Sequence, residues 1–386
     1  MRGNPRKPPH SSPKLFKTVL LIIGRVFITR AVLVLEDGSV WKGKGFGAIA
    51  KVSGEVVFNT GMVGYPESIT DPSYYGQILC QTYPLIGNYG VSSKWFESPK
   101  PMIKGYVVSE MCATPSHATS EKTLDLWLKE NGIPGISGID TRALTKRLRI
   151  KGVMLGILQT YEKKTDLDLL KEEAKNIPDP NERDLVSEVT TKEIKTYNKK
   201  GDKTIVLIDC GVKENIIRCL VKRNVKVVRV PADTDFKKIM SFSPSGVLIS
   251  NGPGDPKKSE KAIRVVKKLM DSEMPVFGIC LGNQILSLAA GGDTYKLKFG
   301  HRSQNQPCIE EKTGRCYITS QNHGFAVAPE SLSKEWKPWF TNANDRTNEG
   351  IMHRSKPWIS VQFHPEASPG PVDTEFIFDV FLGVMK

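Results

Sequence analysis

The 386-residue chain lacks two patterns that would settle its class at once: paired cysteines and long hydrophobic runs. Its seven cysteines include no Cys-x-x-Cys pair and their number is odd. This argues against a disulfide framework or a zinc site, and it predicts a reducing compartment, the cytoplasm. The apolar run TVLLII near the N-terminus is too short to span a membrane. A hydrophobic content of 39% and a charged content of 25% are typical of a globular protein with a sizeable core.

Acidic residues are absent from the first 30 positions, which hold seven Lys or Arg; the remainder carries 48 basic against 41 acidic residues. That mild excess suits small anionic ligands or an acidic partner surface. The sequence contains no stripe of basic residues interleaved with aromatic ones, the pattern that would predict nucleic-acid binding. The basic start loosely resembles a targeting peptide, but Arg25 and Arg30 follow the apolar run closely and no small-residue cleavage site appears. We interpret residues 1–28 as a disordered tail or the product of an upstream start codon.

Strand and helix patterns divide the rest of the chain into two domains and a linker. Residues 29–158 begin with a β-hairpin around Asp37-Gly38 and predict a mixed, strand-rich α/β domain. Residues 159–203 are charged and poorly periodic, which is typical of a linker. In residues 204–386, continuous apolar strands alternate with amphipathic helices. This pattern predicts a doubly wound, mostly parallel α/β domain.

One cysteine stands where such a sheet binds its ligands, outside the carboxyl ends of the strands. In PVFGICLGNQ, a buried strand runs into a helical segment with Cys280 at the junction. Gly278 and Gly282 permit the close backbone passage of a sharp strand-to-helix turn. The helix start favours a thiolate and offers N–H groups to an oxyanion. Cys280 is therefore predicted to be a nucleophile, whereas Cys210 and Cys219 fit small core residues.

A cysteine nucleophile needs a base that a third group orients. The strand WISVQF ends at His364, and Glu366 follows two residues later. We expect His364 to act as base toward the thiol and acid toward the leaving amine, with Glu366 holding the imidazole. The loop SNGPGDP follows the preceding strand, so Gly252 and Gly254 could present N–H groups to a developing oxyanion. Such glycines also form plain turns.

The motifs SNGPGDP, GICLGNQ and QFHPE, in this order and spacing, resemble those of triad-type (class I) glutamine amidotransferases. In that family the cysteine attacks the side-chain amide of glutamine, ammonia leaves, and water releases glutamate from the thioester. The segments GEVVFNTGMVGYPESITDPSYYGQI, GIDTRALTKRLR, QNHGFAV and HPEASPGP are similar to those of the small, glutamine-hydrolysing subunit of carbamoyl-phosphate synthase. This closer resemblance runs from about residue 30 to the end.

The resemblance implies a catalytic set, Cys280, His364 and Glu366, and a glutamine site that the first domain completes. Leu281 would give a backbone N–H, and Gln284, one helical turn beyond the nucleophile, would hydrogen-bond the substrate. The implied L-glutamine-binding residues are Ser73, Gly252, Gly254, Leu281, Gln284, Asn322, Gly324 and Phe325. The last three would recognise the amino-acid end of glutamine.

The family also implies a partner. Its ammonia passes through a protein tunnel to a large subunit, which uses ATP and bicarbonate to make carbamoyl phosphate for pyrimidine and arginine biosynthesis. We expect a heterodimer or higher assembly with that subunit, and no nucleic-acid or membrane partner. The sequence has no P-loop and no metal-binding carboxylate motif. We therefore expect no cofactor and no metal in this chain, with ATP and Mg²⁺ on the large subunit.

Two other functions remain open. One is another triad amidotransferase, such as the glutaminase component for anthranilate or aminodeoxychorismate synthesis; those chains lack the strand-rich first domain. The other is a non-catalytic regulatory subunit, which the intact Cys280, His364 and Glu366 argue against.

The sequence departs from the family at two places. Asn283 stands where the family commonly has His, at a position that is not catalytic. The loop HRSQNQP at 301–307 replaces a Gly-rich, His-containing version, and we expect it to alter partner contacts. We interpret His301 and His323 as structural or interface residues.

Overall fold

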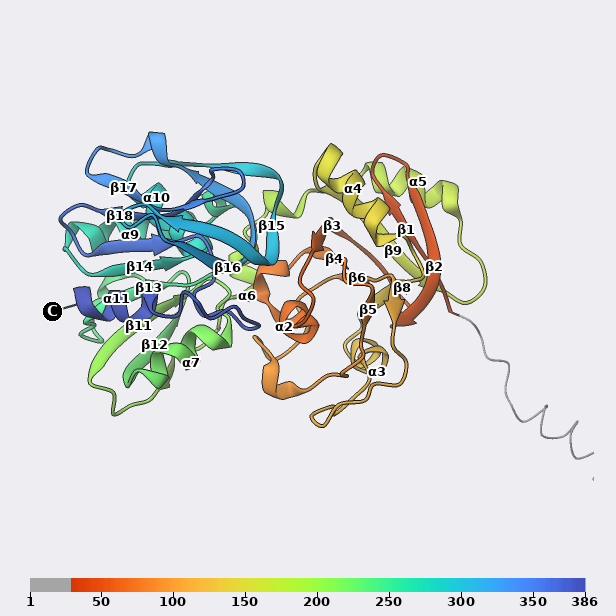
Figure 1. Ribbon diagram of the computed structural model, residues 1–386, viewed down its shortest axis with the longest axis horizontal. Helices are drawn as coiled ribbons and strands as arrows, with labels where there is room; N and C mark the ends of the chain where they lie inside the picture. The colour runs from red at the N-terminus through yellow and green to blue at the C-terminus, as the bar shows by residue number, and fades with distance from the viewer. Residues whose placement is uncertain (1–28, 386) are drawn as a thin grey trace, which may run out of the picture.

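The computed structural model describes residues 29–385, so our interpretation of residues 1–28 lies outside the described part of the chain. The described residues form two domains side by side, an N-terminal barrel and a C-terminal layered α/β domain (Figure 1). None of the helices in this part of the chain is long and apolar enough to cross a membrane.

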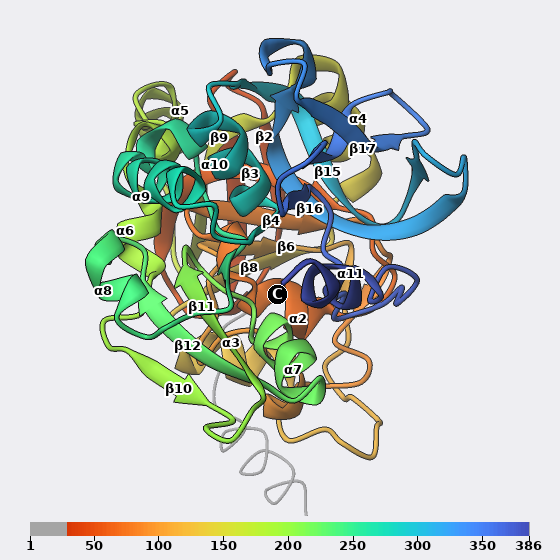
Figure 2. The same cartoon turned by 90° about the vertical axis from the view of Figure 1, so that its left-hand side faces the viewer.

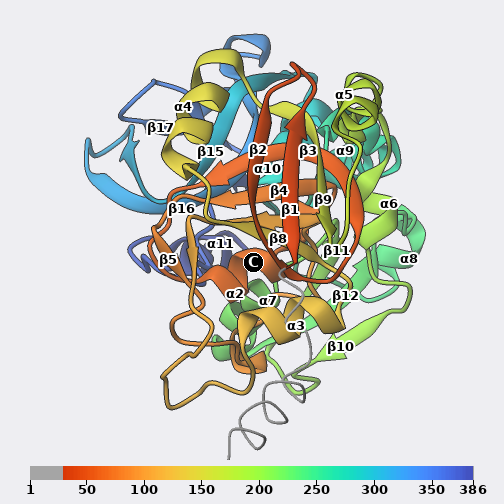
Figure 3. The ribbon, with the colours of Figure 1, turned by 90° about the vertical axis from the view of Figure 1, so that its right-hand side faces the viewer.

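A closed seven-stranded barrel forms the N-terminal domain, in the order β1-β2-β8-β6-β4-β3-β9 (Figure 3). β1 and β2 form the predicted hairpin, in which Val34 lies opposite Val40. The strands of the barrel are β1 (Arg30–Leu35), β2 (Val40–Gly47), β3 (Lys51–Asn59), β4 (Gln77–Gln81), β6 (Gly105–Val107), β8 (Pro134–Ser137) and β9 (Met154–Tyr161). Apolar side chains from β1, β3, β4, β6, β8 and β9 pack together with two leucines of a helix, Leu144 and Leu148, so the barrel interior is a filled core.

Short elements surround the barrel. They are α2 (Tyr65–Thr70), β5 (Leu85–Ile86), β7 (Glu110–Met111), α3 (Leu124–Glu130) and α4 (Thr141–Lys151). The 3₁₀ turns of both domains within residues 29–385 are η1 (Pro72–Tyr74), η2 (Ser93–Trp95), η3 (Pro180–Glu182), η4 (Pro256–Lys258) and η5 (Pro329–Ser331). The carboxylate of Asp71 caps η1 by accepting from the Ser73 backbone N–H. This cap fixes the segment that faces the second domain.

A ten-stranded sheet forms the centre of the C-terminal domain, in the order β10-β12-β11-β13-β14-β19-β18-β17-β15-β16. The neighbouring strands β12, β11, β13, β14 and β19 run parallel to one another. The remaining strands extend the sheet in antiparallel pairs. The strands are β10 (Lys195–Tyr197), β11 (Lys203–Asp209), β12 (Val225–Pro231), β13 (Gly246–Ile249), β14 (Val276–Ile279), β15 (Asp293–Glu310), β16 (Cys316–Ala328), β17 (Trp336–Asn342), β18 (Asn348–His353) and β19 (Trp358–Val361).

Helices cover both faces of the parallel part of this sheet (Figure 2). Along β11, Ile205 and Leu207 pack with α7 (Glu214–Lys222) and α11 (Ile377–Val384). The intervening residues Val206 and Ile208 pack with α8 (Phe236–Met240), α9 (Glu260–Asp271) and α10 (Leu281–Ala289). Alternate side chains of a strand point to opposite faces of the sheet. Because helices cover both faces, side chains on both sides of these strands are buried, which explains why the strands are apolar without interruption. The predicted doubly wound fold is confirmed.

The segment predicted as a linker is folded onto both domains. α5 (Leu167–Lys175) packs Leu170 and Ala174 against β1 and β9 of the barrel. α6 (Leu185–Val189) packs Val186 into the C-terminal core. The charged, irregular composition of residues 159–203 reflects short helices that each have one apolar face. The segment therefore fastens the two domains to each other.

Candidate active site

The backbone turns sharply at Cys280, between β14 and α10. Cys280 has φ 55° and ψ −104°, a strained conformation for a non-glycine residue. A Cβ atom on Gly278 would lie 2.4 Å from the Gly282 carbonyl oxygen, and one on Gly282 would lie 2.2 Å from that of Ile249. Both positions therefore require glycine, and the turn holds the thiol at the carboxyl edge of the sheet.

His364 and Glu366 follow β19, the parallel neighbour of β14. Nδ1 of His364 lies 2.6 Å from Oε1 of Glu366, and both side chains are buried. Burial opposes the charged imidazolium, but Glu366 and Cys280 outweigh it and raise the pKa of His364 to about 10. The charged form of the imidazole is thus favoured next to Cys280.

A buried lysine, Lys213, completes this group and was not among the residues predicted from the sequence. Its Nζ lies 3.1 Å from Oε1 of Glu366 and also donates to the Ala367 carbonyl. Burial would raise the pKa of Glu366, but Lys213 and His364 lower it to about 2. Lys213 follows β11 at the carboxyl edge of the sheet, a placement that could have identified it.

A cavity beside Cys280 brings together most of the residues predicted to bind glutamine. Its wall includes the thiol and seven of the eight: Ser73, Gly252, Gly254, Gln284, Asn322, Gly324 and Phe325. Leu281 is the exception; its side chain is buried in the core below α10. Its backbone N–H has no intrahelical partner at the first position of α10, so it remains available to an oxyanion.

The N-terminal domain reaches this cavity through η1. Nδ2 of Asn251 donates to the Ser73 hydroxyl oxygen at 2.9 Å. Nδ2 of Asn322 donates to Oδ2 of Asp71 at 2.8 Å. These buried bonds cross between the domains, so the position of Ser73 is fixed relative to Cys280.

A second contact between the domains lies behind His364. Glu97, fully buried, accepts hydrogen bonds from the Ser368 hydroxyl at 2.6 Å and the Asn215 backbone N–H at 3.0 Å. It also pairs with Arg218. Because Ser368 lies two residues beyond Glu366, this contact supports the segment that carries Glu366.

One hydrogen-bonded group of four residues on the cavity wall was not predicted from the sequence. Nζ of Lys296 lies 2.8 Å from Oε1 of Glu55, and Gln77 and Asn181 also hydrogen-bond that carboxylate. All four line the cavity. They come from both domains and from the connecting segment, and no sequence motif links them.

Gln284 and Asn283 have different surroundings. Nε2 of Gln284 donates to the Phe325 carbonyl at 2.8 Å, which joins α10 to β16 at the cavity. Asn283, fully buried, donates to Oε1 of Gln362 at 3.0 Å and accepts from the Ser360 hydroxyl at 2.7 Å. Asn283 thus ties the helix to β19 from beneath and does not line the cavity, in agreement with a structural role.

Comparison with known proteins agrees with this architecture. Residues 33–158 match the model of the carbamoyl-phosphate synthase small chain, CPSase domain, and residues 206–384 match that of class-I glutamine amidotransferases. The chain is 53% identical over 352 residues to the carbamoyl phosphate synthase small chain of Methanocaldococcus jannaschii, covering 90% of this chain and 97% of that one. The chain belongs to the carbamoyl-phosphate synthase small-chain family.

Two further relatives show how the family is arranged. The small chain of Methanopyrus kandleri is 48% identical over 361 residues, which cover 92% of this chain and 99% of that one. The multifunctional protein CAD of Squalus acanthias is 53% identical over 363 residues, which cover 91% of this chain but only 16% of that protein. Small-chain sequence thus occurs both as a separate chain and as part of a much longer one.

Proposed function

We propose that this chain hydrolyses L-glutamine to glutamate and ammonia and delivers the ammonia to a carbamoyl-phosphate synthase large subunit. The observation that carries the proposal is the strained Cys280 beside a buried, charge-stabilised His364–Glu366 pair. The family membership of the chain agrees with it.

The first half of the reaction forms a thioester. The thiolate of Cys280 attacks the side-chain amide carbon of glutamine, and the amide oxygen becomes an oxyanion. Backbone N–H groups of Leu281 and of the Gly252 loop would stabilise that charge. His364 gives its proton to the amide nitrogen, the C–N bond breaks, and ammonia leaves.

The second half regenerates the enzyme. His364, now neutral, removes a proton from water, which attacks the thioester carbon. The thiolate leaves and glutamate is released. Glu366 holds the imidazole through both steps, and Lys213 keeps Glu366 ionised.

The remaining residues of the cavity would position the substrate. Ser73 and Gln284 would hydrogen-bond glutamine, and Asn322, Gly324 and Phe325 would meet its amino-acid end. Because Asp71 holds Asn322, docking of the N-terminal domain is needed for a complete site. We propose that ATP, Mg²⁺ and bicarbonate are used on the large subunit, in a heterodimer or higher assembly.

The test is glutamate release from glutamine by the purified chain, alone and with a carbamoyl-phosphate synthase large subunit. We expect slow release alone, a strong rise with the partner, bicarbonate and MgATP, and none from Cys280→Ser. Activity that ignores the partner would indicate another synthase. No activity in either case would indicate a regulatory subunit.

A further inference from the structure

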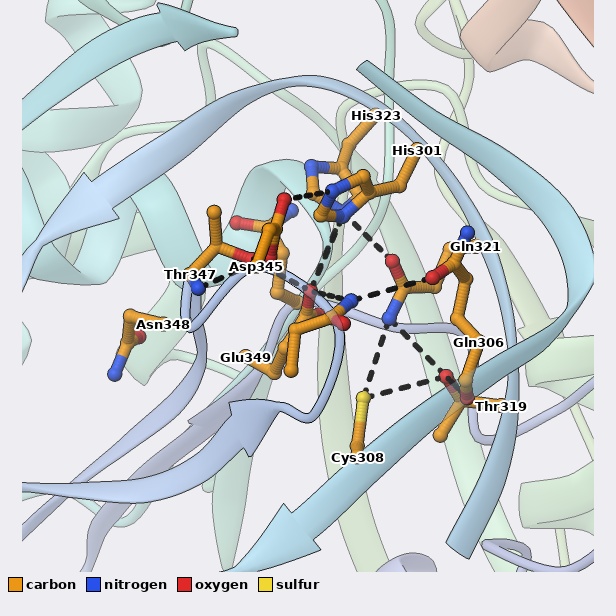
Figure 4. Close-up of polar contacts among 12 residues, drawn as sticks. His301, Gln306, Cys308, Thr319, Gln321, His323, Asp345, Thr347, Asn348 and Glu349 are labelled. Atoms are coloured by element: carbon orange, nitrogen blue, oxygen red, sulfur yellow. Dashed lines mark hydrogen bonds and ion pairs between the residues drawn. The ribbon is translucent and has the colours of Figure 1, made fainter.

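A second buried group of titratable side chains adjoins the glutamine cavity, whose wall includes one of its members, His323. His301 on β15, His323 on β16 and Glu349 on β18 each place one ligand-type atom within 4.8 Å of the others. All three side chains are buried, and His301 lies directly opposite His323 in the β15–β16 ladder. Figure 4 shows the group at the centre of a polar network. The mechanism above uses none of them.

The outer ring nitrogen of each histidine is already committed as a donor. Nε2 of His301 lies 2.8 Å from Oδ2 of Asp345, and Nδ1 of His323 lies 2.8 Å from the Phe325 carbonyl oxygen. A carboxylate and a carbonyl can only accept, so both of these nitrogens carry hydrogen. Metal-binding histidines characteristically hold their second N–H in this way. Of the inner nitrogens, Nδ1 of His301 is hydrogen-bonded to Oε1 of Glu349 at 3.3 Å, and Nε2 of His323 lies 3.9 Å from the same oxygen. A bound metal ion would take the place of the hydrogen between His301 and Glu349.

The orientation of Gln321 creates a conflict that a cation would remove. The Thr319 hydroxyl donates to the Gln306 carbonyl at 2.9 Å, so its oxygen accepts from Nε2 of Gln321 at 3.1 Å. This leaves Oε1 of Gln321 facing Nε2 of His323 at 3.2 Å. When His323 is neutral, both of these atoms are acceptors, and two acceptors do not hydrogen-bond each other.

A cation in the cluster would also meet a carboxylate that is only partly hydrogen-bonded. Within residues 29–385, Oε2 of Glu349 is buried without a hydrogen-bond partner, whereas Oε1, the oxygen near the histidines, also accepts from Nδ2 of Asn342 at 3.2 Å. An unsatisfied buried carboxylate oxygen is costly unless a hydrogen-bond donor or a cation meets it.

We propose that His301, His323 and Glu349 bind a divalent transition-metal ion of the Zn²⁺ type, with Oε1 of Gln321 as a fourth ligand. Two imidazoles and one carboxylate form a recognised zinc ligand set. Metal–ligand bonds of about 2.1 Å in a tetrahedron separate the ligand atoms by about 3.4 Å. The separations of 3.2, 3.3 and 3.9 Å therefore need only small side-chain movements.

The other side of the cluster adjoins a second cavity. His301 and Asp345 line a cavity of about 870 Å³ between the two domains, whose wall also includes Arg302 and Gln306. The bound ion would fix β16 on either side of His323. Because Asn322 and Gly324 flank His323, the site would stiffen the strand that lines the glutamine cavity.

The experiment measures Zn²⁺ binding by the full chain carrying Cys280→Ser, so that the catalytic thiol cannot act as a ligand. After equilibrium dialysis against Zn²⁺, we expect about one bound ion per chain. Co²⁺ bound in its place should give the visible absorption of a four-coordinate ion. His301→Asn and Glu349→Gln in the same background should each weaken Zn²⁺ binding by more than about 100-fold, and Asp345→Asn by about 10- to 100-fold.

The matched control is His117→Asn, which removes an exposed histidine outside the cluster and should leave binding unchanged. Circular dichroism and thermal unfolding of each metal-free variant establish that it is folded. Absence of a retained ion in the Cys280→Ser chain, or binding that survives His301→Asn in a folded protein, would overturn the proposal. In that case the cluster is a hydrogen-bond network alone.

Discussion

Two buried arrangements in the C-terminal domain combine cysteine, histidine and glutamate, yet only one has the surroundings of a nucleophile. In the first, Cys280 lies beside His364, and Glu366 pairs with Lys213. In the second, Cys308 accepts from Gln321, which faces His323, and Glu349 lies near both histidines. The difference lies in charge. The charged form of the imidazole is favoured next to Cys280, whereas burial, and then Glu349, raise the pKa of the Cys308 thiol. Residue types alone therefore do not define the active site.

The largest expected difference is in glutamine hydrolysis after removal of either thiol. Cys280→Ser should lower kcat by about 10⁴-fold or more, as removal of a nucleophile does in other triad enzymes. Cys308→Ala should change kcat by less than about threefold in folded protein. Glutamate release by both variants, at matched circular dichroism, measures the contrast. Equal losses would mean that the second arrangement also supports catalysis.

Lys213 should matter mainly through Glu366. Lys213→Met leaves a buried carboxylate without its ammonium partner, and this should lower the free energy of unfolding at neutral pH by about 3–5 kcal/mol. Urea unfolding followed by tryptophan fluorescence measures the loss. Lys213→Met/Glu366→Gln should recover much of it, because the unpaired charge is gone. If the double variant is as unstable as the single one, packing of the lysine stem is responsible.

The same pair predicts how stability depends on acid. The pKa of Glu366 is lowered to about 2 in the folded protein, below its ordinary value near 4.5. Its contribution to stability is therefore present above about pH 4.5 and is lost as the pH falls toward 2. Lys213→Met removes the main group that lowers this pKa, so the stability of the variant should fall less steeply over that interval. A steeper fall would contradict the assignment.

His364 should titrate at an unusually high pH because Glu366 and Cys280 favour its charged form. Its pKa of about 10 lies above the ordinary value of 6.5, so its contribution to stability is complete below about pH 6.5 and is lost as the pH rises through 10. In Glu366→Gln the pKa should move down toward 6.5. NMR titration of the imidazole resonances measures the shift. An unchanged His364 titration would remove Glu366 from its assigned role.

The sequence predicted the part of the site that follows from strand ends and motifs. Cys280 directly follows a parallel strand, and His364 and Gly252 come shortly after the ends of two others, so the fold itself brings them to one edge of the sheet. Lys213 also follows a parallel strand, but it stands in no recognised motif. Glu55 and the His301–His323–Glu349 cluster were not predicted as site residues, because their partners lie far away in the sequence. Their proximity comes from the closing of the barrel against the sheet and from the long β15–β16 ladder. Neither follows from local periodicity.

The smallest predicted effect concerns Asn283, which lies under the catalytic arrangement without belonging to it. Asn283→Ala removes two buried hydrogen bonds, to Gln362 and from Ser360, and should lower the free energy of unfolding by about 1–3 kcal/mol. Gln362 also accepts from Gln284 at 3.2 Å, so its loosening should raise the KM for glutamine a few-fold while kcat stays nearly constant. Steady-state kinetics separates the two parameters. Asn283→His, which introduces the residue common in the family, should preserve kcat as well. A large fall in kcat with unchanged KM would instead mean that Asn283 takes part in catalysis and does not only support the helix that follows Cys280.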